Sequence, residues 1–111
     1  MPTQEEYLTT YAQGWIEGDV EKVLSAAAPD YVFDDPKGGL YTKSNFRERF
    51  AELKAHRSEQ PFMALSEVVT QNTLEVLTAW CWWNVPGVAQ GSGLIKVGDG
   101  GVLSEKVAYY S

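Results

Sequence analysis

Asp35 is the residue of this chain whose type and position most directly suggest chemistry. It ends a short apolar segment and precedes Pro36. Strand alternation puts Asp35 on the same face as Tyr31 and Phe33, and the residue before a proline is held in an extended conformation. A carboxylate that faces an aromatic-lined cavity is partly desolvated, so we expect its pKa to rise toward that of a general base near neutral pH. Two alternatives remain: a bulge would turn Asp34 inward instead, and a turn aspartate can simply cap a local amide or face solvent.

Tyr11 is a candidate hydrogen-bond donor to a ligand. Tyr11 and Trp15 lie one turn apart on an apolar stripe of helical period. The phenol of Tyr11 can donate to a ligand oxygen, although a buried tyrosine more often packs in the core and finds a protein or water partner.

Glu105 is a second candidate acid. In the last expected strand it alternates with Val107 and Tyr109, which places the three on one face. If that face lines the cavity, Glu105 adds a second carboxylate whose titration separates from that of Asp35. Otherwise this face is an outer interface, or Glu105 pairs with a basic residue at the rim.

Tryptophans occupy both faces of one strand. Trp80 and Trp82 share a face, and Cys81 and Trp83 share the other. We expect Trp80 and Trp82 to line the cavity with Trp15, Phe33 and Phe50, and the opposite face to meet a second protein surface in a homodimer. The alternative is that helices of the same subunit cover these strands.

The elements that must position these side chains are three helices, with a short strand at Tyr31–Asp35 between the second and the third, and longer strands afterwards. The first helix begins with a capping box at Thr3 and Glu6 and ends at Gly18. The second helix is capped by Asp19 and ends at Pro29. The third helix is capped by Thr42 or Ser44 and contains Phe46, Phe50 and Leu53. Strands follow at Phe62–Thr70, Leu74–Val85, Val88–Val97 and Val102–Tyr110, with turns at Gln71–Asn72, Pro86–Gly87 and Gly98–Gly101. The order predicts one α+β domain over residues 1–111, a cone-shaped roll in which three N-terminal helices pack on a strongly curved antiparallel sheet. The open end of the cone is the natural pocket for a small apolar molecule.

Composition excludes several classes of protein. The net charge of -6 argues against nucleic-acid and anionic-membrane partners. Cys81 is the only cysteine and His56 the only histidine, so we expect neither a disulfide nor a metal site. Gly98–Gly101 is a hairpin turn rather than a phosphate cradle, so we expect no cofactor. The polar, acidic N-terminus is unlike a signal peptide and no apolar run reaches membrane-spanning length, so we expect a cytoplasmic protein.

Three segments resemble the nuclear transport factor 2-like superfamily, which includes SnoaL-like polyketide cyclases and ketosteroid isomerases. They are Tyr11 with Gly18-Asp19, the run from Phe33 to Gly38, and a helix beginning near Lys43. The resemblance spans nearly the whole chain in element order, with the strong residue matches in the first half. It implies the cone-shaped roll, frequent homodimers, Asp35 where ketosteroid isomerases carry the catalytic base, and Tyr11 where they carry the oxyanion-binding tyrosine. Those isomerases also use a second, protonated aspartate, and the corresponding stretch here, Gly91–Ile95, contains no acid.

Two functional hypotheses follow. The first is a cofactor-independent isomerase or cyclase-like enzyme, in which Asp35 removes a proton next to a carbonyl and Tyr11 stabilises the enolate oxygen. The alternative is a non-catalytic ligand-binding or dimerisation module with the same cone.

Overall fold

The structure is a computed structural model and describes residues 2–36, 38–55, 63–73, 75–85 and 88–110. Its elements follow one another as α1 (Gln4–Glu17), α2 (Val20–Ser25), β1 (Ala27–Asp35), β2 (Gly39–Thr42), α3 (Phe46–Ala55), β3 (Ala64–Thr73), β4 (Val76–Val85), β5 (Val88–Gly98) and β6 (Gly101–Tyr110). The expected α+β roll, with helices packed on a curved open sheet, is confirmed.

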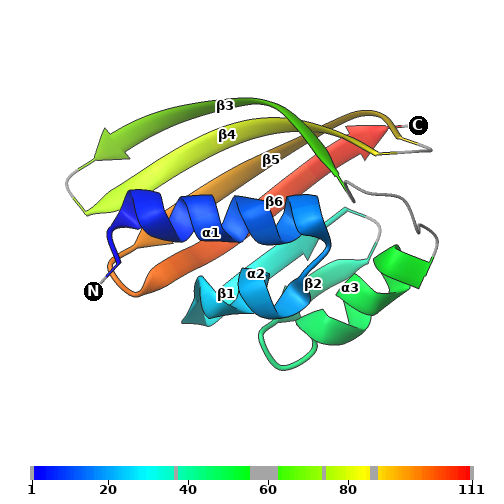
Figure 1. The fold of residues 1–111 in the computed structure, drawn as a ribbon, viewed down its shortest axis with the longest axis horizontal. Coiled ribbons are helices and arrows are strands. Elements are labelled where there is room, and N and C mark those ends of the chain that lie inside the picture. The colour runs from blue at the N-terminus through cyan, green and yellow to red at the C-terminus, as the bar shows by residue number, and fades with distance from the viewer. Residues whose placement is uncertain (1, 37, 56–62, 74, 86–87, 111) are drawn as a thin grey trace.

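The six strands form one sheet in the order β2-β1-β6-β5-β4-β3. All neighbours are antiparallel except β1 and β6, which run parallel, so the expectation of a purely antiparallel sheet is wrong at this pair. The reason is the path of the chain: after β1, β2 and α3 it re-enters at the far edge as β3. It then meanders back until β6 arrives beside β1 in the same direction (Figure 1).

Helix α1 lies across the sheet and contacts β4, β5 and β6 (Figure 1). Its inward residues Tyr11 and Trp15 are buried. The rings of Phe33, Phe46 and Phe50 surround Trp15, with centroids 4.9–5.8 Å away. The core beneath α1 is therefore largely aromatic, and it holds one face of the helix over the sheet.

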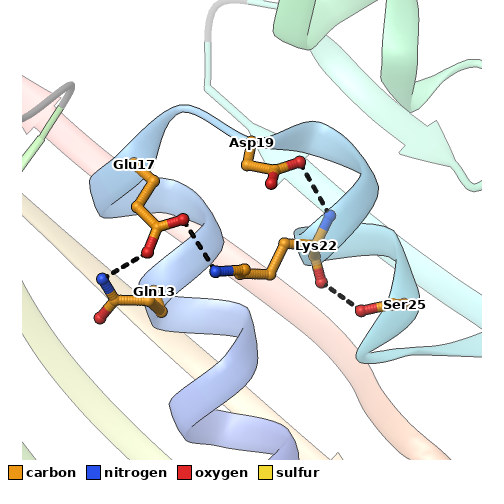
Figure 2. Close-up of polar contacts among 5 residues, drawn as sticks. All are labelled: Gln13, Glu17, Asp19, Lys22 and Ser25. Atoms are coloured by element: carbon orange, nitrogen blue, oxygen red, sulfur yellow. Dashed lines mark hydrogen bonds and ion pairs between the residues drawn. The ribbon is translucent and has the colours of Figure 1, made fainter.

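Local interactions define both ends of α1. The hydroxyl of Thr3 accepts from the amide of Glu6 at 3.1 Å, and the Glu6 carboxylate accepts from the amide of Thr3 at 3.0 Å, so the expected capping box is confirmed. At the other end Gly18 adopts a left-handed conformation with φ 71°, and Asp19 caps α2 through the amide of Lys22. Figure 2 shows the contact from Lys22 back to Glu17, which joins the two helices. The Nζ of Lys22 donates to Oε1 of Glu17 at 2.8 Å.

Several element boundaries differ from the sequence-based expectations. Pro29 lies inside β1 instead of ending α2, because β1 already begins at Ala27. The turn expected at Gln71–Asn72 is wrong, since β3 continues to Thr73, which pairs with Val76. Strand β2 was not anticipated, because its glycine-rich start resembles a loop.

Some expectations concern residues outside the described part of the chain. These are the strand start at Phe62 and the turn at Pro86–Gly87. Among the described residues, none of the helices has the length and apolar character needed to cross a bilayer.

The left-handed glycine after α1 can be tested by substitution. Gly18→Ala should lower the free energy of unfolding by about 1 kcal/mol, because an L-residue is strained at positive φ. Gly100→Ala is the matched control, since Gly100 has no positive φ and nothing within 4 Å of an added Cβ. Urea denaturation measures both; an equal effect of the two substitutions would contradict the strain argument.

Candidate functional site

A cavity of about 180 Å³ lies between α1 and the inner face of the sheet, a volume close to that of engineered cavities that bind benzene. Most of its lining is apolar or aromatic, and the exceptions are two acids and one arginine. The lining residues used below are Tyr11 and Trp15 from α1, Phe33 and Asp35 from β1, Arg49 from α3, Cys81 and Trp83 from β4, and Glu105, Val107 and Tyr109 from β6.

Glu105 is one of the two acids, and only 5% of its surface is exposed. Its Oε1 accepts a short hydrogen bond from the hydroxyl of Tyr11. The Tyr11 hydroxyl in turn lies 2.7 Å from that of Tyr31. Oε2 makes no hydrogen bond with any described residue. The result is a buried chain of two phenols and a carboxyl group, held by α1, β1 and β6.

Burial governs the protonation of this chain. It raises the pKa of Glu105 to about 7, and the hydrogen bond from Tyr11 only partly opposes the rise. Burial, followed by the charge of Glu105, raises the pKa of both Tyr11 and Tyr31 well above the ordinary value. The same two causes raise the pKa of Cys81 to about 12, so its thiol stays protonated and unreactive. Glu105 is therefore the member of this group that can exchange a proton near neutral pH.

Asp35 is the other acid and has different surroundings. It is buried on the face of Tyr31 and Phe33, as the strand alternation predicted, while Asp34 is only half-buried. The guanidinium of Arg49 donates to its Oδ2 from Nη2 at 2.7 Å and from Nε at 3.1 Å, and the hydroxyl of Tyr109 donates to Oδ1 at 3.1 Å. Both partners stabilise the ionised carboxylate, whereas the sequence argument had considered desolvation alone.

Arg49 is the functional candidate that sequence reasoning missed. Its side chain is only 16% exposed and projects from the inner side of α3. The available signal was its spacing, three residues after Phe46 and four before Leu53, which places it on the apolar stripe of that helix. A cation at such a position indicates a buried anionic partner, here Asp35.

The parallel pairing of β1 and β6 sets the separation of the two acids. Phe33 pairs with Glu105 and Asp34 with Lys106, so Asp35 lies two positions farther along the sheet than Glu105, on the same face. A rise of about 3.3 Å per residue and a strand spacing of about 4.8 Å put their Cα atoms about 8 Å apart. The cavity therefore contains two carboxyl groups that have different hydrogen-bond partners and lie on the same face of the neighbouring strands β1 and β6.

Most of the other predicted site residues also border the cavity. Trp15, Phe33 and Tyr109 line it together with Tyr11. Phe50 does not; it is buried behind Trp15, with the ring centroids 4.9 Å apart, and supports that wall. The indole N–H of Trp15 has no hydrogen-bond acceptor among the described residues.

The expected direction of Trp80 and Trp82 is wrong. Trp80 is 38% exposed and Trp82 half-buried, and neither lines the cavity; Cys81 and Trp83 do so instead. Alternation predicted two faces for β4 but could not tell which one is inner. The register decides this, because it pairs Cys81 with Gly93 on the inner face of β5.

No three histidine, cysteine, aspartate or glutamate side chains gather into a metal site within the described ranges. The polar groups that line the cavity and could hold a ligand include the two acids, their hydrogen-bond partners and the indole N–H of Trp15.

The sequence matches no family model and no curated protein. Solved structures, however, match over nearly the full length. A nuclear transport factor 2-like protein of unknown function from Cytophaga hutchinsonii has a TM-score of 0.71 at 12% identity, covering 98% of this chain and 91% of that one. TerC, co-crystallised with polyporic acid, has a TM-score of 0.72 at 16% identity, covering 96% and 90%. A proposed polyketide cyclase from Xanthomonas campestris pv. campestris has a TM-score of 0.67 at 16% identity, covering 97% and 89%.

These matches define the class of fold. The chain has the nuclear transport factor 2-like fold, and the resemblance stated from its sequence is confirmed at that level.

The buried carboxyl group predicts a pH-dependent effect of Glu105→Gln on stability. The pKa of Glu105 is raised from 4.5 to about 7 in the folded protein, so the stability it contributes is complete below pH 4.5 and is lost as the pH rises through 7. Glutamine has no such dependence. Relative to the wild type, the variant should gain roughly 3 kcal/mol between pH 4 and pH 9.

Urea denaturation of both proteins across this pH range measures the gain, since the carboxyl group at position 105 is the titrating group that the substitution removes. A difference between the proteins that does not change with pH would show that Glu105 titrates normally.

Proposed function

We propose that this protein binds a small apolar carbonyl compound in the cavity and transfers a proton at the carbon next to the carbonyl. Asp35 is the base in this proposal. When the substrate binds, the Tyr11 hydroxyl turns from Oε1 of Glu105 to donate to the carbonyl oxygen, and Glu105 in its protonated form donates to the same oxygen. The chemistry needs no cofactor, because a placed base and hydrogen-bond donors to the oxygen are sufficient.

The observation that carries the proposal is the contrast between the two carboxyl groups of one cavity. The hydrogen bonds that Arg49 and Tyr109 donate favour the ionised form of Asp35, whereas burial raises the pKa of Glu105 to about 7 and so favours its protonated form. Two acids whose surroundings separate their protonation states are the usual arrangement for assigning one as base and the other as acid. The acid missing from Gly91–Ile95 is thus supplied by the neighbouring strand β6.

The dimensions of the cavity support a small substrate. About 180 Å³ holds a molecule of one or two rings, and the apolar walls favour a compound with few polar groups. Cα atoms about 8 Å apart allow one carbonyl compound to meet Asp35 at its acidic carbon and Glu105 at its oxygen. TerC, which has a similar fold, was co-crystallised with polyporic acid, and this supports an organic ligand here.

The ion pair with Arg49 has a consequence for the mechanism. A guanidinium that stabilises the carboxylate also makes it a weaker base. A substrate that displaces one of the contacts of Arg49 or Tyr109 would restore basicity to Asp35, while Arg49 retains a place near the negative charge that develops.

Exchange of the α-hydrogens of 2-indanone in D2O, followed by proton NMR, tests the proposal. Asp35→Asn should lower the protein-catalysed rate at least 100-fold, because it removes the base without changing the shape of the side chain. Glu105→Gln should have a smaller effect, since the amide still donates a hydrogen bond. If Asp35→Asn retains the rate and Glu105→Gln loses it, the two roles are reversed.

The pH dependence of the same reaction checks the role of Glu105. After subtraction of the rate without protein, the wild-type rate should fall as the pH rises above about 7, because Glu105 loses the proton that it donates. Glu105→Gln should remove this decline. A wild-type rate that stays constant to pH 9 would contradict a protonated Glu105 in the reaction.

A non-catalytic binding module is the second candidate function. The contacts of Asp35 with Arg49 and Tyr109 favour it, because they are also what a purely structural ion pair would make. Binding of 2-indanone without exchange would support this module over the enzyme.

We also propose that the protein forms a homodimer through the outer face of the sheet and that it is located in the cytoplasm. Val69 and Trp80 are paired across β3 and β4, both on that outer face, and are 46% and 38% exposed. Leu94 pairs with Trp80 from β5, so three adjacent strands present apolar side chains.

Trp80→Glu should shift the protein toward the monomer, because a charge would replace the centre of this apolar strip. Sedimentation equilibrium of wild type and variant measures the change, with the exposed Asp99→Ala as the control. A wild type that is monomeric at millimolar concentration would contradict the dimer.

A further inference from the structure

Gly93 of β5 lies directly beneath the carboxyl group of Glu105. A Cβ atom placed on Gly93 with ideal geometry would be 2.5 Å from Oε2 of Glu105 and 3.2 Å from Sγ of Cys81. The first distance is too short for atoms that are not bonded. A side chain at position 93 and the carboxyl group in its present place therefore exclude each other.

The backbone does not explain a glycine at this position. Positive φ angles among the described glycines occur at Gly18, Gly39 and Gly101, so Gly93 adopts a conformation open to any residue. A glycine within a strand otherwise weakens it. The remaining reason for a glycine at position 93 is that another group occupies the space of a side chain, and that group is the carboxyl of Glu105.

The sheet register shows how Glu105 reaches this place. Glu105 pairs with Ile95 across β6 and β5, and Gly93 pairs with Val107. Gly93 is thus a diagonal neighbour of Glu105, at a Cα distance of about 7–8 Å that long side chains can cover. The carboxyl group lies over β5, although its residue belongs to β6.

We propose that positions 93 and 105 serve one shared carboxyl site, with Gly93 as the positioning residue that admits the acid of Glu105. An acid attached at position 93 can occupy the same site from β5. Standard bond lengths put the carboxylate oxygens of an aspartate about 2.4 Å from its own Cβ. That reach matches the 2.5 Å from the Gly93 Cβ position to Oε2. The shared position of the two acids follows from these distances alone, whereas its effect on catalysis rests on the proposed function.

A cycle of substitutions tests the geometry without any activity measurement. Gly93→Ala should lower the urea midpoint of the wild type, and should lose at least half of that effect when Glu105→Ala is also present. Gly91→Ala is the matched control, because its Cβ would lie 2.5 Å from the ring of Trp83 and not near a carboxyl group. It should lower the midpoint equally with and without Glu105→Ala. Equal effects of Gly93→Ala in the two backgrounds would overturn the proposal.

Rescue from the other strand tests the shared site directly. Glu105→Ala should lower the rate of 2-indanone exchange and remove its decline above about pH 7. The double variant Gly93→Asp with Glu105→Ala should regain at least tenfold in rate together with that decline. A folded double variant that behaves like Glu105→Ala would overturn the proposal.

The stability measurements and the exchange assay together distinguish a failure of the shared site from a failure of the proposed function. If the wild type itself catalyses no exchange, the proposed function fails and the substitution cycle decides the shared site. In that case the double variant should lose stability relative to Glu105→Ala between pH 4 and pH 9, as the wild type does. Absence of this recovered pH dependence would overturn the shared site.

Discussion

The site depends on one constraint, the burial of the Glu105 carboxyl group in an apolar cavity. A carboxylate in such surroundings is costly unless it is hydrogen-bonded or protonated, and this chain uses both means. Tyr11 donates to one oxygen, Tyr31 supports Tyr11, and burial raises the pKa of the acid to about 7. The same contact joins α1 to β6, because the Tyr11 hydroxyl reaches Glu105 across the cavity.

The second acid has been stabilised in the opposite way. Asp35 receives hydrogen bonds from a guanidinium and a phenol, so it can be buried as an anion. Because β1 and β6 are parallel neighbours, the two acids share a face of the sheet only two positions apart. One cavity therefore holds a carboxyl group whose hydrogen bonds favour the charged form and one whose pKa burial raises to about 7. This asymmetry, more than the likeness in fold, is what supports acid–base chemistry.

The sequence predicted more of the fold than of the site. The capping box at Thr3, the helix end at Gly18 and the inward face of Asp35 were all local patterns, and the structure confirms each. The direction of Trp80 and the partner of Asp35 were not predictable in the same way. Both depend on which strand or helix lies opposite, and period-two alternation says only that two faces exist.

Glu105 shows which features follow from the sequence and which follow only from the tertiary structure. The sequence by itself determined the order of the helices and strands apart from β2, the acidic and aromatic residue types, and the alternation that puts Glu105 with Val107 and Tyr109. Only the tertiary structure decided that this face is the inner one, that Gly93 leaves space for the carboxyl group, and that Tyr11 meets it from α1. The physical reason is that helix caps and strand alternation arise from neighbours along the chain, whereas burial and hydrogen bonding join residues 94 positions apart.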